Sequence, residues 1–266
     1  MPANDAALVG LDGELALLRE AAREAGRIAL RYFRRDPDVW MKDGNSPVSE
    51  ADLAVDRFLH DGLMAARPDY GWLSEETADD LARLEARRTF VVDPIDGTRA
   101  FVDGRDVWCV SVAIVEDGRS IAGVLDCPVL DEVYEASAGG GARRNGEPLA
   151  VNGTRDEPVL GGPAWMTRQL PAALRDRMHR IAHIPSLAYR LAMVADGRLD
   201  GTFIRPDSHD WDIAAAELVL REAGGHLVGS DGDTPPMATR NSRHGRMAAG
   251  SPAMLPQLLS TLRTMT

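Results

Sequence analysis

The segment Phe90-Val91-Val92-Asp93-Pro94-Ile95-Asp96-Gly97-Thr98 carries most of the information about the fold and its chemistry. Its first three residues are apolar and mostly β-branched, which predicts a buried strand. Asp93 stands at the carboxyl end of that strand, where α/β proteins place their ligand sites. Pro94 fixes the backbone direction, and Gly97 lets a ligand approach the backbone closely. We therefore expect a rigid turn that presents two carboxylates at the end of a central strand.

This pair of carboxylates suits hard divalent cations. Asp93, Asp96 and the Ile95 carbonyl between them offer the oxygen ligands that such cations prefer. The Thr98 hydroxyl could orient a water, and the amides after Gly97 could hold a phosphate. Metals in this kind of site activate water and neutralise the charge of a phosphoryl group in transit. The segment therefore predicts phosphoryl chemistry by direct attack of water.

Hydrophobic periodicity on both sides of this segment predicts alternating strands and helices. Apolar residues at three- and four-residue steps over 15–32 predict an amphipathic helix, and Ser49 three residues before Asp52 resembles a capping box for a second one. Asn145-Gly146 is typical of a hairpin turn. We expect strands at 90–92, 107–115, 121–125, 132–136 and 199–204 and near 227 and 247, and further helices at 172–181, 187–194 and 212–223 and from 252.

The mixture of strands and helices indicates an α/β (α+β) protein, with an expected boundary near residue 155. The 266 residues are 44% hydrophobic and 27% charged, with a formal net charge of −11, which is ordinary for a globular protein. The acidic excess argues against a nucleic-acid surface, and no apolar run is long enough for a membrane span. Cys109 and Cys127 are expected to be buried free thiols, and the start of the chain lacks a signal-peptide pattern, so we expect a cytoplasmic protein.

Several motifs together resemble the inositol monophosphatase superfamily. The hexapeptide from Asp93 to Thr98 is one of these motifs, and together the motifs stand along the chain in the order that the family has. The resemblance covers most of the chain. The remaining motifs are Lys42 with Ser46-Pro47-Val48-Ser49-Glu50-Ala51-Asp52, Ser74-Glu75-Glu76, the stretch from Gly139 to Gly146, Trp211-Asp212-Ile213-Ala214-Ala215, and Glu222-Ala223-Gly224-Gly225.

The resemblance implies a layered α/β/α/β/α sandwich with the site between two halves. Residues 1–155 would form an N-terminal α+β half with most metal ligands, and 156–266 a C-terminal α/β half with Asp212 and substrate contacts. Members typically need Mg2+, about two to three ions per site, and many are inhibited by Li+. The family is commonly homodimeric and acts on small phosphorylated metabolites.

The resemblance also implies roles for individual residues. Thr98 would help to activate the attacking water, with Asp52 hydrogen-bonded to it in support, and Glu75 and Glu76 would complete the catalytic set. Substrate contacts would come from Gly97, Thr98, Asp96, Asp212 and Lys42, the last near the metal cluster. The metal ligands would be Glu75, Asp93, the Ile95 carbonyl, Asp96 and Asp212.

The substrate is less clearly specified by the sequence. Inositol-specific members carry a Glu seven residues before the Asp of Trp-Asp, and an ungapped count here reaches Arg205. A guanidinium accepts no hydrogen bond from a sugar hydroxyl but could contact a second phosphate. A gap of one or two residues would place Pro206 or Asp207 there instead. We expect an inositol monophosphatase, with a 3'(2'),5'-bisphosphate nucleotidase or a histidinol phosphatase as alternatives.

A protein of a different class would be a non-catalytic sensor of metal or phosphate on the same fold. The intact carboxylate set argues against this alternative, because a sensor would be free to lose some of those residues. His179 and His183 stand four residues apart on the helix expected at 172–181, but the short spacing alone does not predict a metal site.

Overall fold

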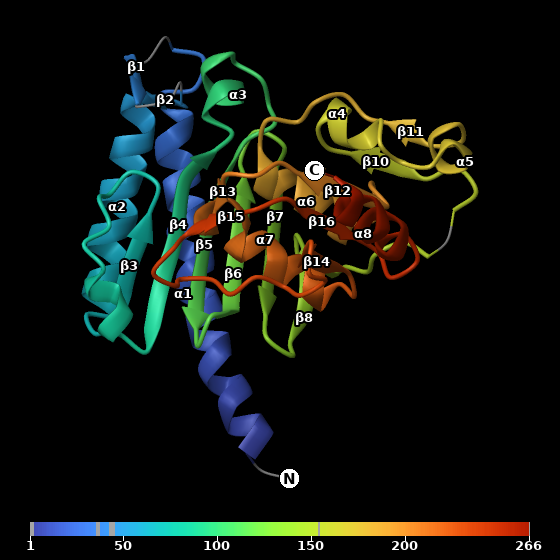
Figure 1. Cartoon of the computed structure of the whole chain (residues 1–266). Helices are drawn as coiled ribbons and strands as arrows, with labels where there is room; N and C mark the ends of the chain where they lie inside the picture. Colours follow the sequence, from blue (N-terminus) through green and yellow to red (C-terminus); the bar gives the residue numbers. More distant parts are fainter. Residues whose placement is uncertain (1–2, 36–37, 43–45, 154, 266) are drawn as a thin grey trace.

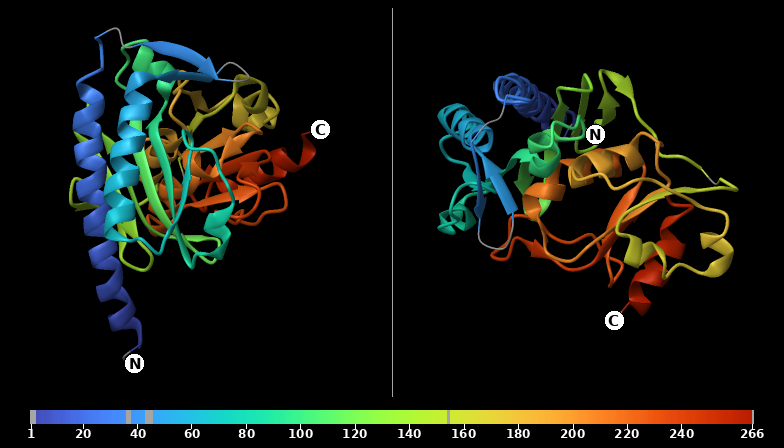
Figure 2. Two further views of the ribbon diagram at one scale, coloured as in Figure 1. Left: turned by 90° about the vertical axis from the view of Figure 1, so that its left-hand side faces the viewer. Right: turned by 90° about the horizontal axis from the view of Figure 1, so that it is seen from above.

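The structure is a computed structural model that describes residues 3–35, 38–42, 46–153 and 155–265. These residues fold into five alternating layers of helices and sheets (Figure 1). Helices α1 (Ala3–Leu30) and α2 (Glu50–Ala66) form one outer layer. In the side view of Figure 2 they lie opposite the C-terminal helix α8 (Leu255–Thr264), with both sheets between. The expected layered α/β/α/β/α sandwich is confirmed.

The larger sheet has seven strands and is antiparallel except for its parallel pair β3–β4. The predicted hairpin is confirmed, since Asn145 and Gly146 join β8 to β9 with φ of 52° and 87°. A two-residue turn of this kind requires positive φ. In spatial order the strands are β3 (Gly71–Ser74), β4 (Arg88–Asp96), β5 (Cys109–Glu116), β6 (Arg119–Cys127), β7 (Glu132–Ser137), β8 (Gly141–Arg144) and β9 (Glu147–Pro148).

Both faces of this sheet are covered, so side chains of β4 alternate between two buried layers. Phe90 and Val92 pack with α1 and α2, whereas Val91 packs with the middle helices α6 (Leu187–Ala195) and α7 (Asp210–Glu222). Gly123 in β6 brings α7 close to the sheet, because a Cβ there would lie 3.0 Å from the Ala215 Cα. This close approach fixes the position of α7.

The smaller sheet lies on the other side of the middle helices. In β12, Ile204 packs toward α6 and α7 and Phe203 packs toward α8. The connection from β9 to this sheet contains the boundary expected near residue 155, and the division into two halves stays a prediction. In spatial order the strands are β11 (His179–Arg180), β10 (Val159–Gly161), β12 (Gly201–Ile204), β16 (Met247–Gly250) and β14 (His226–Gly229).

Short elements connect these layers. The capping box predicted at Ser49 is present at the start of α2. The short elements are β1 (Val39–Lys42), β2 (Ser46–Ser49), a 3-10 turn (Ala82–Glu85), α3 (Thr98–Val102), α4 (Ala164–Thr167), α5 (Ala172–Arg175), β13 (Ser208–His209) and β15 (Arg243–His244).

The helix predicted at 172–181 is wrong beyond its first turn. Helix α5 ends at Arg175, and His179–Arg180 forms strand β11. The edge of the smaller sheet supplies backbone partners at this point: the His179 amide donates to Pro158 and the Ile181 amide to Leu160. This pairing outweighs the local helical pattern, so His179 and His183 do not share a helix face.

Two further expectations concern the whole chain. Cys109 and Cys127 are both buried and free, as predicted. Among the described residues, we find no helix with the length and apolar character that a membrane crossing requires.

Candidate active site

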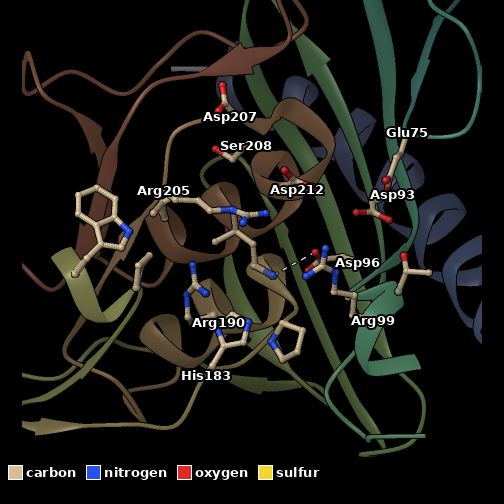
Figure 3. Close-up of a pocket in the computed structure, with 17 residues that line it drawn as sticks. Glu75, Asp93, Asp96, Arg99, His183, Arg190, Arg205, Asp207, Ser208 and Asp212 are labelled. Carbon is tan, nitrogen blue, oxygen red and sulfur yellow. Dashed lines mark hydrogen bonds between the residues drawn. The ribbon is translucent and has the colours of Figure 1, made fainter. Parts of the chain in front are cut away.

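A cavity of about 510 Å³ opens where the carboxyl end of β4 meets the N-termini of α6 and α7 (Figure 3). The carboxylates of Glu75, Asp93, Asp96 and Asp212 lie toward one end, and the guanidinium groups of Arg190 and Arg205 lie toward the other (Figure 3). Gly97 and Thr98, from the turn into α3, lie on the carboxylate side. The lining carboxylates are Glu75, Asp93, Asp96, Asp207 and Asp212.

Three of these carboxylates converge. Oxygen atoms of Asp93, Asp96 and Asp212 lie within 4.8 Å of one another. The first two come from β4, and Asp212 comes from the first turn of α7. Glu75 lies outside this group of three but follows β3, whose parallel pairing with β4 brings it to the same wall of the cavity. All four carboxylates predicted as metal ligands therefore line one site.

Asp96 is held by the start of helix α6. Its Oδ2 accepts hydrogen bonds from the Ser186 hydroxyl and from the Ala188 amide at 2.6 Å. Its Oδ1 accepts a third from the Leu187 amide at 3.2 Å. These donors lie at the positive end of a helix, where the first amides have no partner within the helix. These three hydrogen bonds therefore connect β4 of the larger sheet to helix α6 of the middle layer at the site.

Asp93 and Asp212 are fixed by shorter-range bonds. Asp93 Oδ1 accepts from the Ile95 amide at 3.0 Å, within the last part of β4, where the pairing with β5 shifts register between Asp93 and Asp96 in place of the expected turn. Asp212 Oδ2 accepts from the His209 amide at 2.7 Å, which closes a capping box at the start of α7. The ring of His209 stacks on Trp211 at 4.4 Å between centroids. Each carboxylate is therefore oriented by its own backbone environment.

The electrostatics of these three buried carboxylates favour a bound cation. Burial raises the pKa of Asp93 well above its usual range, and the nearby charges of Glu75 and Asp96 raise it further. Burial also raises the pKa of Asp96, against the hydrogen bond from Ser186 that lowers it. Burial of the carboxyl group raises the pKa of Asp212, and the negative charge of Asp96 raises it further, to about 7. Such crowded oxygens match the ligands that Mg2+ takes, and a divalent cation would relieve their repulsion.

Thr98 and Asp52 form the hydrogen-bonded pair that the resemblance implied. Thr98 Oγ1 lies 3.3 Å from Asp52 Oδ1 and 3.1 Å from the Ile95 carbonyl. Asp52 does not line the cavity and is buried behind Thr98, where its Oδ2 accepts from the Ser49 amide at 2.8 Å. The capping box of α2 therefore orients a carboxylate toward the cavity hydroxyl.

The other predicted residues are placed as follows. Gly97 has φ of 97°, and a Cβ there would lie 3.2 Å from the Ser186 nitrogen, so both conformation and packing favour glycine. Glu76 follows Glu75 but is not among the described residues that line the cavity. Lys42 ends β1, and its side chain lies outside the part of the chain that the structure describes.

The cationic end of the cavity was largely missed by the sequence analysis. Arg205 lines it as expected for a substrate contact, together with Arg190 and His183, and Arg99 also lines the cavity. The one available signal was an arginine inside the apolar run of α6. That pattern does not reveal which surface the guanidinium faces.

Comparisons with known proteins agree with this geometry. A sequence model of the Inositol monophosphatase family matches residues 12–266. An inositol-1-monophosphatase of Rhizobium meliloti is 34% identical over 235 residues, which are 84% of this chain and 88% of the relative. A 3'(2'),5'-bisphosphate nucleotidase CysQ of Aggregatibacter actinomycetemcomitans is 32% identical over 216 residues, 77% of this chain and 80% of the relative.

A solved structure shares the whole fold. The extragenic suppressor protein suhB of Bartonella henselae matches with a TM-score of 0.84 and 28% identity, covering 96% of this chain and 100% of that one. The family whose model matches consists of metal-dependent phosphatases that hydrolyse phosphate monoesters. The chain belongs to the inositol monophosphatase family.

Proposed function

We propose that this protein hydrolyses a phosphate monoester of a small metabolite with Mg2+ held at the carboxylate end of the cavity. The convergence of Asp93, Asp96 and Asp212 beside Glu75 is the observation that carries the proposal. The Ile95 carbonyl would be a further ligand. When bound, the ions would neutralise phosphate charge and favour the ionised form of water.

Residues of the chain would supply orientation and proton handling. The single hydrogen of the Thr98 hydroxyl points to Asp52 or to the Ile95 carbonyl, which leaves a lone pair for a water in the cavity. Thr98 would thus orient that water, and Asp52 would hold Thr98 in the required rotamer. The amides of Gly97 and Thr98, at the start of α3, would bind phosphate oxygens. Asp212 and Lys42 would contact the substrate, and Glu76 would support the site from beside Glu75.

Inositol 1-phosphate is the first substrate that we propose, because an inositol-1-monophosphatase is among the relatives with substantial identity. Adenosine 3',5'-bisphosphate is a second candidate, favoured by Arg205 at the position where inositol-specific members carry Glu. Histidinol phosphate carries an ammonium group, which the guanidinium groups of the cavity would repel. It is therefore the weakest of the three.

The test is phosphate release from these three substrates, each with Mg2+ and with a chelator. We expect near-zero release in chelator and full recovery on addition of Mg2+. Appreciable turnover without metal would contradict the proposed metal-dependent mechanism. If no substrate is turned over at any Mg2+ concentration, the protein would instead be a sensor of metal or phosphate.

Because the chain belongs to the inositol monophosphatase family, we also propose its response to Li+, its oligomeric state and its location in the cell. We expect inhibition by Li+, measured as a dose-dependent fall in phosphate release. We expect a homodimer, which light scattering would report as twice the mass of the 28.8 kDa chain. We expect a cytoplasmic location, and fractionation of the source cells would test it.

A further inference from the structure

Asp212 reaches the cavity from a different part of the fold than the other carboxylates. Asp93 and Asp96 lie in the last part of β4, whereas Asp212 lies in the first turn of α7. The hydrogen bond that Asp212 accepts from the His209 amide lies within that helix start, so it orients the carboxylate but does not place the helix relative to the larger sheet. Other contacts have to hold the start of α7 at the distance that a shared cation requires.

Asp210, two residues before Asp212, joins the start of α7 to the segment 238–244. Its side chain is fully buried, with Oδ1 at 2.7 Å from His244 Nε2 and Oδ2 accepting from the Ala238 amide at 2.9 Å. A carboxylate oxygen accepts hydrogen bonds, so the imidazole N–H donates to it. His244 is also buried and belongs to β15, which pairs with β13 directly before α7 (Figure 1). Because a buried carboxylate is costly without such a partner, loss of His244 should disturb this helix start.

Arg83 ties the same segment to the connection between β3 and β4. It is 3% exposed, and its Nη1 and Nη2 donate to the carbonyl oxygens of Ala238 at 2.7 Å and Thr239 at 2.8 Å. Asp79 holds the same guanidinium through two hydrogen bonds, at 2.8 and 3.1 Å. The connection begins with Glu75, which directly follows β3. A continuous set of hydrogen bonds therefore runs from the connection that carries Glu75 to the start of α7.

We propose that Arg83, Asp210 and His244 form an anchor for α7, which holds Asp212 in place relative to Glu75 and so raises the affinity of the site for Mg2+. None of the three anchor residues is among the described residues that line the catalytic cavity, so they are positioning residues. The inference rests on the proposed function and goes beyond it, since it assigns a role to residues outside the cavity. Mg2+ requires near-ideal octahedral geometry, so a small displacement of one carboxylate weakens binding.

The test measures Mn2+ binding, because Mn2+ takes the same oxygen ligands as Mg2+ and the electron paramagnetic resonance signal of the free ion is lost on binding. His244→Leu removes the donor to Asp210 and should weaken Mn2+ binding about 10- to 100-fold. His244→Gln keeps an N–H near the position of Nε2 and should bind Mn2+ with close to the wild-type affinity. Excess Mg2+ should restore kcat of His244→Leu, with little change in the KM for the substrate.

The matched control is Arg221→Leu, in the last turn of the same helix. Arg221 donates to the Ser120 carbonyl of β6 at 2.8 Å and to Glu217 at 3.0 Å. Its replacement should lower Tm, as His244→Leu does, but should leave the Mn2+ affinity unchanged, because these contacts lie at the end of α7 that is remote from Asp212.

Arg83→Lys tests the anchor from its other side and gives the answer if His244→Leu does not fold. One ammonium group cannot serve both carbonyl oxygens that the guanidinium contacts, so Mn2+ binding should weaken about three- to tenfold. In the double variant, the combined loss of affinity should be smaller than the product of the two single losses, since both act on one segment. Independent losses that multiply fully would contradict a single anchor.

Two results separate the inference from the proposed function. If His244→Leu and Arg83→Lys fold and bind Mn2+ as tightly as the wild type, the three residues serve only the stability of the fold, and the inference is wrong while the metal site remains. If the wild type shows no Mn2+ binding that Asp93→Asn abolishes, the proposed function fails, and this inference fails with it.

Discussion

At the scale of single residues, the site depends on carboxylates that are costly to bring together. Asp93 is buried among Glu75, Asp96 and Asp212, and each neighbour raises its pKa. Aspartates in such surroundings do not stabilise the fold at neutral pH. Their placement is therefore explained by what they bind, and this gives the first prediction.

Asp93→Asn should abolish phosphate release while leaving the fold intact. The amide preserves the shape of the side chain but removes a shared metal-ligating charge, so we expect a loss of roughly a thousandfold in kcat/KM. The metal-free variant should melt at or above the wild-type temperature at pH 8, because one buried negative charge is gone. Asp12→Asn, at an exposed position on α1, is the control. Full turnover by Asp93→Asn would show that the metal site is misplaced.

Thr98→Val tests whether the cavity hydroxyl acts in the reaction. Valine keeps the branched shape but loses Oγ1, which now lies near Asp52 and the Ile95 carbonyl. We expect kcat to fall by about 100-fold or more with little change in KM, as for loss of an acid–base contact. Thr98→Ser retains the hydroxyl and should recover most of the rate. Equal rates for the Val and Ser variants would remove Thr98 from the mechanism.

At the scale of secondary structure elements, two helix starts orient the site. The start of α6 holds Asp96 through three donors, and the start of α7 carries Asp212 in a capping box. The preference of serine for the first position of a helix explains where α6 begins, because Ser186 caps α6 by accepting a hydrogen bond from the Tyr189 amide. The same serine thus serves both the helix and Asp96, which we propose as a metal ligand.

Ser186→Ala should separate these two effects. Loss of the cap would lower the free energy of unfolding by about 1 kcal/mol, which thermal denaturation measures. Loss of the hydrogen bond to Asp96 would raise the Mg2+ concentration for half-maximal activity by about tenfold, the usual cost for a residue behind a metal ligand. Excess Mg2+ should restore the rate. An unchanged Mg2+ requirement would mean that the two amides hold Asp96 sufficiently without Ser186.

At the scale of the whole molecule, metal binding and folding should be linked through pH. The pKa of Asp212 is raised to about 7 in the fold from a usual value near 3.8, so the folded protein binds a proton that the unfolded chain has lost. Without metal, the free energy of unfolding should therefore fall as pH rises from about 4 to 7. Asp93 and Asp96, whose pKa values are also raised, act in the same direction.

Mg2+ should reverse this loss. Calorimetry in chelator and in Mg2+ should show a larger metal-induced rise in Tm at pH 7.5 than at pH 5.5. At a hundredfold excess over Kd, the stabilisation is about 2.7 kcal/mol, or roughly 5–10 °C in Tm for a chain of this size. A rise in Tm that is equal at both pH values would show that these carboxylates do not bind the ion.

The elements that the sequence could predict are those with strong local patterns. The helix expected at 212–223 lies within two residues of the observed α7 at both ends, whereas the strand expected at 90–92 is present but continues to Asp96. The helix expected at 172–181 failed because an edge of the smaller sheet offered better backbone partners to His179. Such a partner is distant in sequence, so no local pattern reveals it.

The sequence by itself determined the chemical groups and their local geometry. The irregular end of β4 and its passage through Gly97 into α3 follow from a strand, a proline and a glycine, and the orientation of Asp52 follows from its capping box. Tertiary structure alone decided that Asp212 meets Asp93, and that Arg190 and Arg205 form the opposite wall. The reason is physical: local backbone preferences act over a few residues, whereas the packing of α6 and α7 against both sheets sets which distant side chains share a cavity.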